Sequence, residues 1–379
     1  MAARPKLALV LSGGGARAAY QAGVLQAIAE RTPRDIPSPF AIVCGTSAGA
    51  INAAAMAAGA LHFYRATSEL QSLWSALRSD DIYRTDRWHL AKTGGRWLMS
   101  FMPGLTHRRP GSLLDNTPLG ALLERVVPFA GVRAAQDAGV LEAFAVTAMS
   151  YHSGMSVTFC DARPEVVLWE RAQRIGVRAK IGVPHLLASS AIPFVFAPSA
   201  IDGEYFGDGA VRQVTPTAPA LHLGADRILV IGAARSSIRP EPPQSTAPPS
   251  VAQIGGQVLA SIFTDALGTD LEKVRLINAA VRQIPADRLA ASPVPLRDVA
   301  MTVVTPSVAL EEVALAHVAE LPGAIRVLLS SVGGTGEGGA GLLSYLLFEP
   351  GYCRALIQLG YADAQSKRDE IDALLAGAF

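Results

Sequence analysis

A serine lies between two glycines in "GTSAG", directly after a short β-branched run. Gly45, Thr46, Ser47, Ala48 and Gly49 form a G-x-S-x-G pattern, and an alanine-rich stretch typical of a helix follows them. The pattern alone also arises by chance in a chain rich in glycine and alanine. Between a strand and a helix, however, the two glycines permit a tight turn that lifts the serine hydroxyl above the sheet edge, where the helix dipole points. The context predicts that Ser47 is a nucleophile.

Three further glycines end the first apolar run, in "LVLSGGGARAAYQAGVL" at residues 9–25. The backbone N–H groups of Gly13, Gly14 and Gly15 can closely approach a negatively charged group, and Arg17 adds positive charge one turn further along. If both apolar runs are parallel strands, their carboxyl ends meet at one edge of the sheet, so this loop lies beside Ser47. The anion is then the transient oxyanion of an acyl transfer.

A dinucleotide-binding turn is a second interpretation of the same glycines. Residues 13–18 satisfy G-x-G-x-x-A between a strand and a helix. That fingerprint needs an acidic residue at the end of the second strand, whereas the second run ends in "CGTSAGA" and Asp35 precedes it. A phosphate loop is excluded because no Gly-Lys-Ser/Thr follows. We therefore expect no cofactor and no metal, and a non-catalytic lipid- or cofactor-binding module is the alternative from another class.

The base that a nucleophilic serine needs is harder to find. None of the histidines lies in a loop after a core strand; they are His62, His89, His107, His152, His185, His222 and His317. Asp208 lies between two glycines in "IDGEYFGDGAVRQVTP", just after an apolar run. An Asp-Gly there is either a simple turn or the end of a catalytic strand, and the residues alone leave both roles open.

Three patterns of the sequence resemble the patatin-like phospholipase family in their order: the glycine loop with its arginine, G-T-S-A-G, and the downstream Asp-Gly-Ala. "LLASSAIPFVFAP" and "GEYFGDGAVRQVTPTAPALHLGADRILVIGA" resemble its later blocks, so the resemblance covers roughly residues 6–233. It implies that Ser47 is the nucleophile, that Asp208 is its base in a Ser-Asp dyad, and that the glycine loop with Arg17 forms the oxyanion site. Ala210 departs from the Asp-Gly-Gly that the family usually shows.

The resemblance also implies a reaction and a substrate class. The expected activity is that of a lipid acyl hydrolase of the phospholipase A or lysophospholipase type, which cleaves carboxylic esters through an acyl-serine intermediate. An esterase or thioesterase acting on short or polymeric acyl substrates is the alternative with the same chemistry. The expected partner is a phospholipid or another acyl lipid, and the head group, chain length and oligomeric state are left open.

Alternating apolar runs and helical spacings predict the elements that position this site. Apolar runs typical of strands lie at 6–12, 41–44, 144–151, 156–160, 166–169, 227–233 and 298–308, and helices are expected over 16–30, 48–60, 183–191 and 251–284. We expect a three-layer α/β/α patatin-like fold with a mostly parallel central sheet. We also expect three parts along the chain: a catalytic core over residues 6–233, a Pro/Ser-rich loop or linker over 234–250, and a mainly helical C-terminal extension over 251–379 that packs on the core.

Composition narrows the classes of function that the chain can have. Half of its 379 residues are hydrophobic, 17% are charged and the formal net charge is +1, which excludes extensive disorder and gives no reason to expect nucleic acid as a partner. Three widely separated cysteines favour a reduced, cytoplasmic location. The N-terminal apolar run is too short for a secretory signal. Residues 41–61 lack charge, but their pattern favours a buried strand and helix over a membrane span.

One segment differs from the rest of the chain. Residues 82–109 hold six Lys/Arg against one acidic residue, together with aromatic residues that include Tyr83, Trp88, Trp97 and Phe101. Basic and aromatic residues mixed in this way are typical of peripheral contact with an anionic lipid surface. The same mixture suits an amphipathic cap that packs its aromatic side chains on the core, and an active-site lid is compatible with both.

Overall fold

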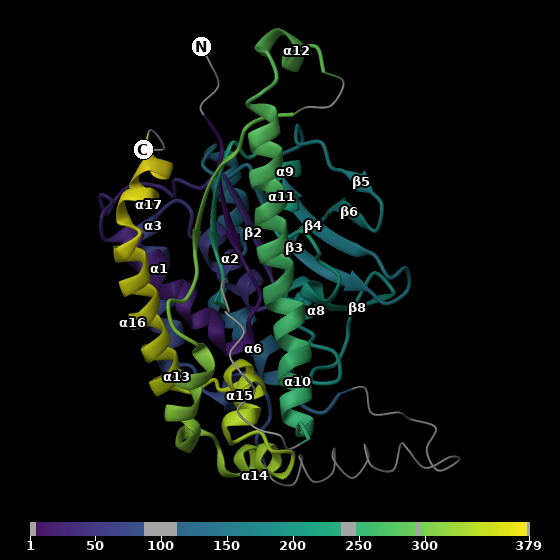
Figure 1. Ribbon diagram of the computed structural model, residues 1–379, viewed down its shortest axis with the longest axis vertical. Coiled ribbons are helices and arrows are strands. Elements are labelled where there is room, and N and C mark those ends of the chain that lie inside the picture. The colour runs from purple at the N-terminus through teal and green to yellow at the C-terminus, as the bar shows by residue number, and fades with distance from the viewer. Residues whose placement is uncertain (1–4, 87–111, 236–247, 293–295, 377–379) are drawn as a thin grey trace.

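The computed structural model describes residues 5–86, 112–235, 248–292 and 296–376 (Figure 1). Its strands are β1 (Leu7–Leu11), β2 (Ile42–Thr46), β3 (Ala143–Ser150), β4 (Ser156–Ala162), β5 (Glu170–Arg171), β6 (Arg174–Arg178), β7 (Ser199–Ile201), β8 (Glu204–Asp208), β9 (Arg227–Ile231) and β10 (Ala300–Val304). Its helices up to residue 222 are α1 (Ala19–Ala29), α2 (Ala48–Ala58), α3 (Phe63–Ala76), α4 (Ser79–Ile82), α6 (Thr117–Val126), α7 (Ala130–Asp137), α8 (Val183–Ser189) and α9 (Ala218–His222). The later helices are α10 (Val251–Ala260), α11 (Ala266–Val281), α12 (Ala286–Ala290), α13 (Leu310–Ala316), α14 (Gly323–Ser331), α15 (Ala340–Leu346), α16 (Pro350–Ser366) and α17 (Arg368–Leu375).

The strands form one mixed sheet with a parallel centre. The order β10-β9-β1-β2-β3 is parallel at every pairing. Beyond β3 the sheet continues with the antiparallel strand β4, then with β6 and β5, and the hairpin β7–β8 joins the end of β3 antiparallel. The predicted α/β fold with a largely parallel central sheet is confirmed, and the antiparallel part is confined to the side beyond β2.

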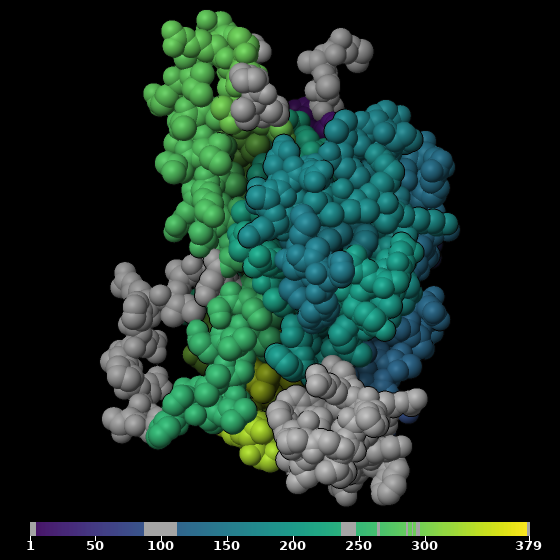
Figure 2. Space-filling view, turned by 90° about the vertical axis from the view of Figure 1, so that its right-hand side faces the viewer, coloured from purple at the N-terminus to yellow at the C-terminus, as the bar shows by residue number. Residues whose placement is uncertain are grey.

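Alternate residues of the central strands face two different helical layers. In β1, Leu9 belongs to the core shared with α1, α2, α3 and α16, whereas Val10 belongs to a second core shared with α9 and α11. Leu229 and Val230 divide in the same way on β9. A strand buried on both faces reads as a continuous hydrophobic run, which is why these strands were visible in the sequence. The two cores place α16 and α11 on opposite faces of the sheet. In Figure 1, α16 lies at the left and α11 runs in front of the strands, and Figure 2 shows α11 and α12, in green, beside the teal strand-rich part.

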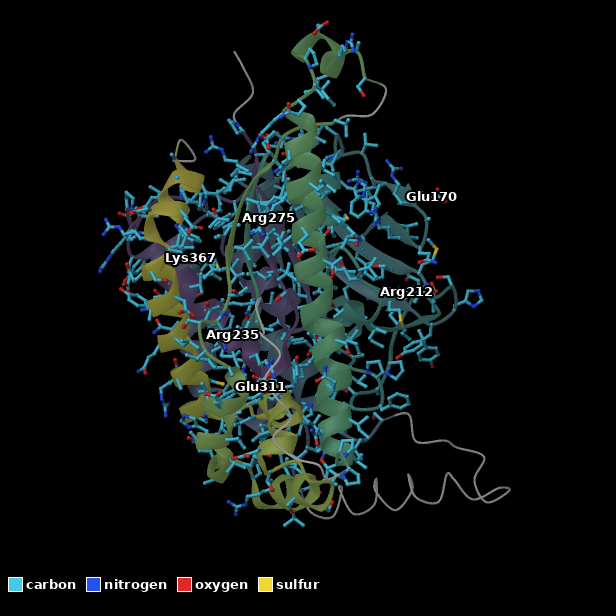
Figure 3. All side chains as sticks on the ribbon, viewed as in Figure 1. Glu170, Arg212, Arg235, Arg275, Glu311 and Lys367 are labelled. Atoms are coloured by element: carbon cyan, nitrogen blue, oxygen red, sulfur yellow. The ribbon has the colours of Figure 1, made fainter. Side chains whose placement is uncertain are left out.

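Residues beyond 250 contribute directly to the sheet and its cover. β10 is an edge strand paired with β9, and the Nζ atom of Lys367, at the end of α16, donates to the carbonyl oxygen of Val303 at 2.8 Å (Figure 3). Helices α1 and α16 cross at backbone contact, because a Cβ atom at Gly23 would lie 1.9 Å from the carbonyl oxygen of Ile357. The C-terminal helices therefore pack on the core. The predicted limits of core, linker and extension stay a prediction.

Several predicted elements differ in detail from those observed. Residues 166–169 form no strand and belong to the connection that leads into β5. Val166 and Trp169 in this connection are buried, and Val167 is exposed. The expected helix over 251–284 is divided by a π-helical segment, Ser261–Asp265. Residues 41–61 form a strand and a helix as expected, and none of the described helices is both long and apolar enough to cross a membrane. Residues 236–247 of the Pro/Ser-rich stretch lie outside the described residues.

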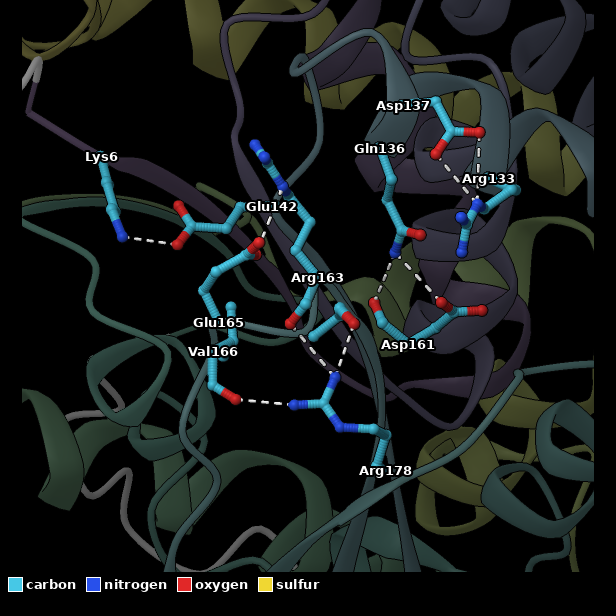
Figure 4. A network of polar contacts seen from close by, with 11 residues as sticks. Lys6, Arg133, Gln136, Asp137, Glu142, Asp161, Arg163, Glu165, Val166 and Arg178 are labelled. Carbon is cyan, nitrogen blue, oxygen red and sulfur yellow. Dashed lines mark hydrogen bonds and ion pairs between the residues drawn. The ribbon is translucent and has the colours of Figure 1, made fainter.

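A polar network closes the end of the sheet where the parallel strands begin (Figure 4). Arg178 donates to the carbonyl oxygens of Ala162, Arg163 and Val166, and the amide of Gln136 donates to both the backbone and the side chain of Asp161. The register of β4 on β3 places these residues at the opposite end of the sheet from Thr46, where β2 ends. This network therefore lies away from the carboxyl ends of the parallel strands, where Ser47 is located.

Candidate active site

Ser47 is the single residue between β2 and α2, and its backbone adopts φ 56° and ψ −132°. A positive φ is uncommon for a residue with a side chain and marks a strained turn. Its flanking glycines are required for space, because a Cβ atom at Gly45 would lie 2.4 Å from the carbonyl oxygen of Gly49 and one at Gly49 would lie 2.3 Å from that of Leu11. Both contacts are far shorter than van der Waals distance. The G-x-S-x-G pattern thus folds as the predicted strand-turn-helix elbow.

The sheet brings Asp208 to the same place. Strand β2 pairs with β3 as far as Thr46, which lies opposite Thr147. Beyond that point β8 pairs with the same edge of β3, so Asp208 lies opposite Ala148, the next residue of β3. As a result Ser47 Oγ donates a hydrogen bond to Asp208 Oδ2 at 2.5 Å. The other carboxylate oxygen, Oδ1, accepts from the backbone N–H of Ala210 at 2.9 Å. Residue 210 takes part in this contact through its backbone N–H group, which alanine has as glycine does.

Burial sets the proton affinity of Asp208. Its side chain is fully buried. Removal from water raises the pKa of Asp208 to about 7, and the hydrogen bonds from Ser47 and Ala210 oppose this rise only in part. A carboxylate with a pKa near neutrality can take up a proton from a serine and release it again, which is the property required of a general base.

The glycine loop presents unpaired donors beside this pair. Among the described residues, none accepts a hydrogen bond from the N–H groups of Gly13, Gly14 or Gly15. Gly13 touches Ser47, since a Cβ atom at Gly13 would lie 3.0 Å from the Cβ atom of Ser47. Gly15 has a φ of +55°, and protein atoms of Phe263, Ala233 and Tyr345 pack against the three glycines. Adjacent free N–H groups next to a hydroxyl can stabilise an oxyanion that forms there.

The sequence assigns Arg17 to the oxyanion site, whereas its guanidinium group faces the C-terminal helices. Nη2 of Arg17 lies 2.6 Å from Glu311 Oε1, Nε donates to Ser344 Oγ at 2.9 Å, and the guanidinium stacks on the ring of Tyr345 at 4.0 Å from its centroid. Glu311 lies near α15 in Figure 3. The side chain of Arg17 is only 3% exposed. This geometry favours a role in holding the loop against the C-terminal segment, and it leaves the glycine N–H groups as the donors beside Ser47.

Ser189 is a residue of the site that sequence reasoning missed. Its Oγ accepts a hydrogen bond from the backbone N–H of Ser47 at 2.8 Å and donates one to the carbonyl oxygen of Thr147 at 2.6 Å. The hydroxyl thereby ties the strained elbow to β3. It also occupies the N–H group of Ser47, which cannot then serve an oxyanion. The only signal in the sequence was its place in the block "LLASSAIPFVFAP".

An apolar cavity adjoins the serine on one side. It has a volume of about 520 Å³, including the part open to solvent, and Gly15, Ser47, Ala48 and Ser190 are among the residues that line it. The remaining wall is mainly hydrophobic and is contributed by Ile51, Leu73, Trp74, Leu77, Ile82, Leu119, Leu122, Ile192, Phe196 and Phe348. Phe348 comes from the C-terminal segment and stacks on Trp74 with a centroid distance of 6.4 Å. A hydrophobic cavity that begins at a nucleophile suits a hydrocarbon chain.

The two histidines that follow Asp208 in the chain have partners away from Ser47. His222 stacks on Trp169, and burial lowers its pKa to about 4, helped by nearby arginines. His317 pairs through Nδ1 with Glu320. Among the described residues no histidine bonds to Ser47 or Asp208, and His89 and His107 lie outside the described part of the chain.

Only part of the basic and aromatic segment can be placed. Tyr83 is fully buried, and its hydroxyl donates to the carbonyl oxygen of Leu346 at 2.8 Å, so this aromatic side chain packs on the core. Residues 87–109, with Trp88, Trp97 and Phe101, lie outside the described residues. Within the ranges that are described, no group of three or more His, Cys, Asp or Glu side chains is arranged to bind a metal ion.

The family model of patatin-like phospholipases matches residues 9–221, which include the glycine loop, Ser47 and Asp208. The chain belongs to the patatin-like phospholipase family. Membership in this family supports a lipid hydrolase function. No curated protein matches the chain.

Two solved structures are similar over almost the whole chain. VipD from Legionella pneumophila shares 13% identity at a TM-score of 0.38, over 99% of this chain and 67% of VipD. The human GIVD cytosolic phospholipase A2, in complex with methyl gamma-linolenyl fluorophosphonate, shares 14% identity at a TM-score of 0.46, over 99% of this chain. The patatin-like chain spans 59% of that human enzyme. The family assignment rests on the family model and on the residues of the site.

Proposed function

We propose that this patatin-like protein hydrolyses carboxylic esters of acyl lipids through an acyl-Ser47 intermediate, as a phospholipase A or lysophospholipase. The hydrogen bond of 2.5 Å from Ser47 Oγ to Asp208 Oδ2 carries the proposal. A serine hydroxyl whose proton already points at a buried carboxylate needs no third residue to remove that proton.

In the first half of the reaction, Ser47 Oγ attacks the ester carbonyl carbon while its proton moves to Asp208. The carbonyl oxygen becomes an oxyanion, which the N–H groups of Gly13, Gly14 and Gly15 stabilise. The carbon–oxygen bond to the leaving alcohol then breaks, and Asp208 returns the proton to the alcohol oxygen. The carboxylate can make both transfers because its pKa lies at about 7.

In the second half, water releases the fatty acid. Asp208 accepts a proton from the water molecule as its oxygen attacks the acyl carbon, and the same glycine N–H groups stabilise the second oxyanion. The bond between the acyl carbon and Ser47 Oγ breaks, and Ser47 recovers its proton from Asp208. No proton or electron is left over, and no cofactor is required by these steps.

Two observations support an acyl lipid as the substrate. The chain belongs to a phospholipase family, and the cavity beside Ser47 is lined mainly by hydrophobic side chains. An esterase or thioesterase for short acyl groups uses the same chemistry but does not need such a cavity. A module that binds a cofactor through the glycines has less support, because it gives no role to the hydrogen bond between Ser47 and Asp208 beside the loop.

A panel of phospholipids, lysophospholipids and neutral lipids tests this proposal, with the released acids identified by mass spectrometry. We expect release of fatty acids from at least one lipid class by the wild type and none by Ser47→Ala. Hydrolysis confined to acetyl and butyryl esters would favour the esterase alternative. Equal release by the wild type and Ser47→Ala, both purified from an esterase-free host, would remove Ser47 from the mechanism.

A further inference from the structure

Backbone pairing brings the strands of the dyad together, and it stops where the chemistry begins. Strand β2 pairs with β3 as far as Thr46, and β8 pairs with β3 as far as Asp208. Among the described strands, β8 pairs with β3 and β7, so β3 is the neighbour that it shares with β2. Ser47 and the turn Gly209–Val211, whose Ala210 N–H group holds the Asp208 carboxylate, lie beyond these pairings.

A buried glutamine bridges the two segments that lie beyond the pairing. Gln213 is 8% exposed, and its backbone N–H group donates to the carbonyl oxygen of Gly209 at 3.1 Å, which closes the turn. Its side-chain Oε1 accepts a hydrogen bond from Thr46 Oγ1 at 2.6 Å. Its Nε2 donates to Thr147 Oγ1 on β3 at 3.2 Å. The amide therefore joins the residue before the nucleophile, the central strand and the turn after the base.

The segments that this amide joins are in direct contact. A Cβ atom at Gly209 would lie 2.1 Å from the carbonyl oxygen of Thr147 and 3.0 Å from Cγ2 of Thr46. The same carbonyl oxygen of Thr147 accepts from Ser189 Oγ, which in turn accepts from the N–H group of Ser47. Ser189 thus holds the backbone of the elbow, and the glutamine holds the residue before it against the turn after the base.

We propose that Gln213 is a positioning residue for the dyad of Ser47 and Asp208. The inference rests on the proposed function, because it concerns the geometry of attack by Ser47. The amide links Thr46 to the turn that follows Asp208, so the attacking oxygen and the carboxylate that takes its proton stay 2.5 Å apart. A misplacement of about 1 Å in the reacting groups can lower a rate about a hundredfold.

An amide suits this position because it offers an acceptor and a donor at once. The hydroxyl of Thr46, which is 5% exposed, needs an acceptor, and Oε1 supplies it. Thr147 accepts from Nε2, while its own hydroxyl lies 3.1 Å from that of Thr158. A carboxylate at position 213 has no proton to donate to Thr147, and an apolar side chain takes away the acceptor that the buried hydroxyl of Thr46 uses.

Gln213→Met removes the amide and keeps an unbranched side chain. We expect kcat for p-nitrophenyl octanoate to fall about tenfold or more while KM stays within about twofold, because Gln213 is not among the described residues that line the apolar cavity. Gln136→Met is the matched control. Gln136 is 7% exposed, and its amide makes two hydrogen bonds to Asp161 at the far end of the sheet. This control should lose melting temperature as Gln213→Met does, but it should keep its kcat.

The partner of the glutamine supplies a rescue. Thr46→Val keeps the shape of the side chain and loses the hydroxyl, so it should lower kcat, whereas Thr46→Ser keeps the hydroxyl and should retain most of the activity. The double variant Thr46→Val with Gln213→Met should fall no further than Gln213→Met alone, since both changes break the same contact. Calorimetric melting and initial rates measure all of these variants.

Equal kcat in Gln213→Met and Gln136→Met would overturn the inference, as would additive losses in the double variant. Should Gln213→Met fail to fold, the pair of Thr46 variants decides alone, and equal kcat in Thr46→Val and Thr46→Ser would also overturn it. Absence of ester hydrolysis by the wild type would instead show that the proposed function is wrong.

Discussion

Ser47 Oγ and Asp208 Oδ2 lie 2.5 Å apart although 161 residues separate them in the chain. The register of the sheet creates this contact, because β2 and β8 occupy successive positions along the same side of β3. Both residues sit directly at strand ends, so the distance between them is fixed by backbone pairing. A dyad held in this way is preorganised and does not depend on the closing of a loop.

Replacement of Asp208 by Asn should remove nearly all activity. The amide keeps the size of the side chain but cannot accept the serine proton, and we expect kcat to fall by three orders of magnitude or more, about the loss seen for a catalytic base. His222→Gln and His317→Gln are the matched controls and should keep activity within about tenfold of the wild type. A histidine variant as inactive as Asp208→Asn, with an unchanged circular dichroism spectrum, would contradict the histidine-free mechanism.

The pH dependence of catalysis follows from the pKa of Asp208. The base must be ionised to accept a proton, and burial raises its pKa to about 7. We therefore expect kcat/KM for a soluble ester to rise about tenfold per pH unit below neutrality and to level off above it. Initial rates between pH 5 and pH 9 measure this profile. A flat profile from pH 5 to pH 7 would be incompatible with Asp208 as the base.

Asp208 should also make the protein less stable as the pH rises. The pKa is about 7 in the folded state against 3.8 for an unperturbed aspartate, so between these values the folded protein holds a proton that the unfolded chain has released. Stability then falls with rising pH across this window and is constant above it. Asp208→Asn has no carboxyl group at this position and so lacks this loss of stability. The melting temperature of the variant minus that of the wild type should therefore increase from pH 4 to pH 7. A gain that is independent of pH would argue against the raised pKa.

Much of the site could be predicted because its signals are local. The elbow and the glycine loop are short patterns between a strand and a helix, and a Cβ atom at Gly15, Gly45 or Gly49 would lie within 2.4 Å of a backbone carbonyl oxygen. The place of Asp208 was ambiguous in the sequence, since Asp-Gly also marks a turn, and only the pairing of β8 with β3 brings its carboxylate to Ser47. The partners of Arg17 could not be predicted, because Glu311 and Ser344 lie 294 and 327 residues further along the chain.

The glycine loop can be tested by displacement. At Gly15, with its φ of +55°, a Cβ atom would lie 2.4 Å from the carbonyl oxygen of Tyr345, so Gly15→Ala must shift the loop. We expect kcat to fall by about a hundredfold or more, the usual effect of losing an oxyanion donor, with a modest change in KM. Gly268→Ala on α11 is the control, because nothing lies within 4 Å of a Cβ atom there. Equal kinetics for Gly15→Ala and Gly268→Ala would argue against an oxyanion hole in the loop.

Contact of residues 82–109 with lipid is a prediction from the sequence. Six basic residues and several aromatic ones suit an anionic surface. Replacing Trp88, Trp97 and Phe101 by Ala should weaken sedimentation with phosphatidylglycerol vesicles and spare hydrolysis of a small soluble ester. Loss of both properties together would point to a packing role for these side chains.

The most direct test of the acyl-serine mechanism is covalent trapping of Ser47. A fluorophosphonate reacts with an activated serine, whose oxygen bonds to phosphorus while fluoride leaves. We expect one adduct per chain by intact-protein mass spectrometry, located on Ser47 by peptide mapping and absent from Ser47→Ala and strongly reduced in Asp208→Asn. Wild-type protein that hydrolyses a lipid ester while its Ser47 stays unmodified by excess reagent, or an adduct on a different serine, would contradict the account.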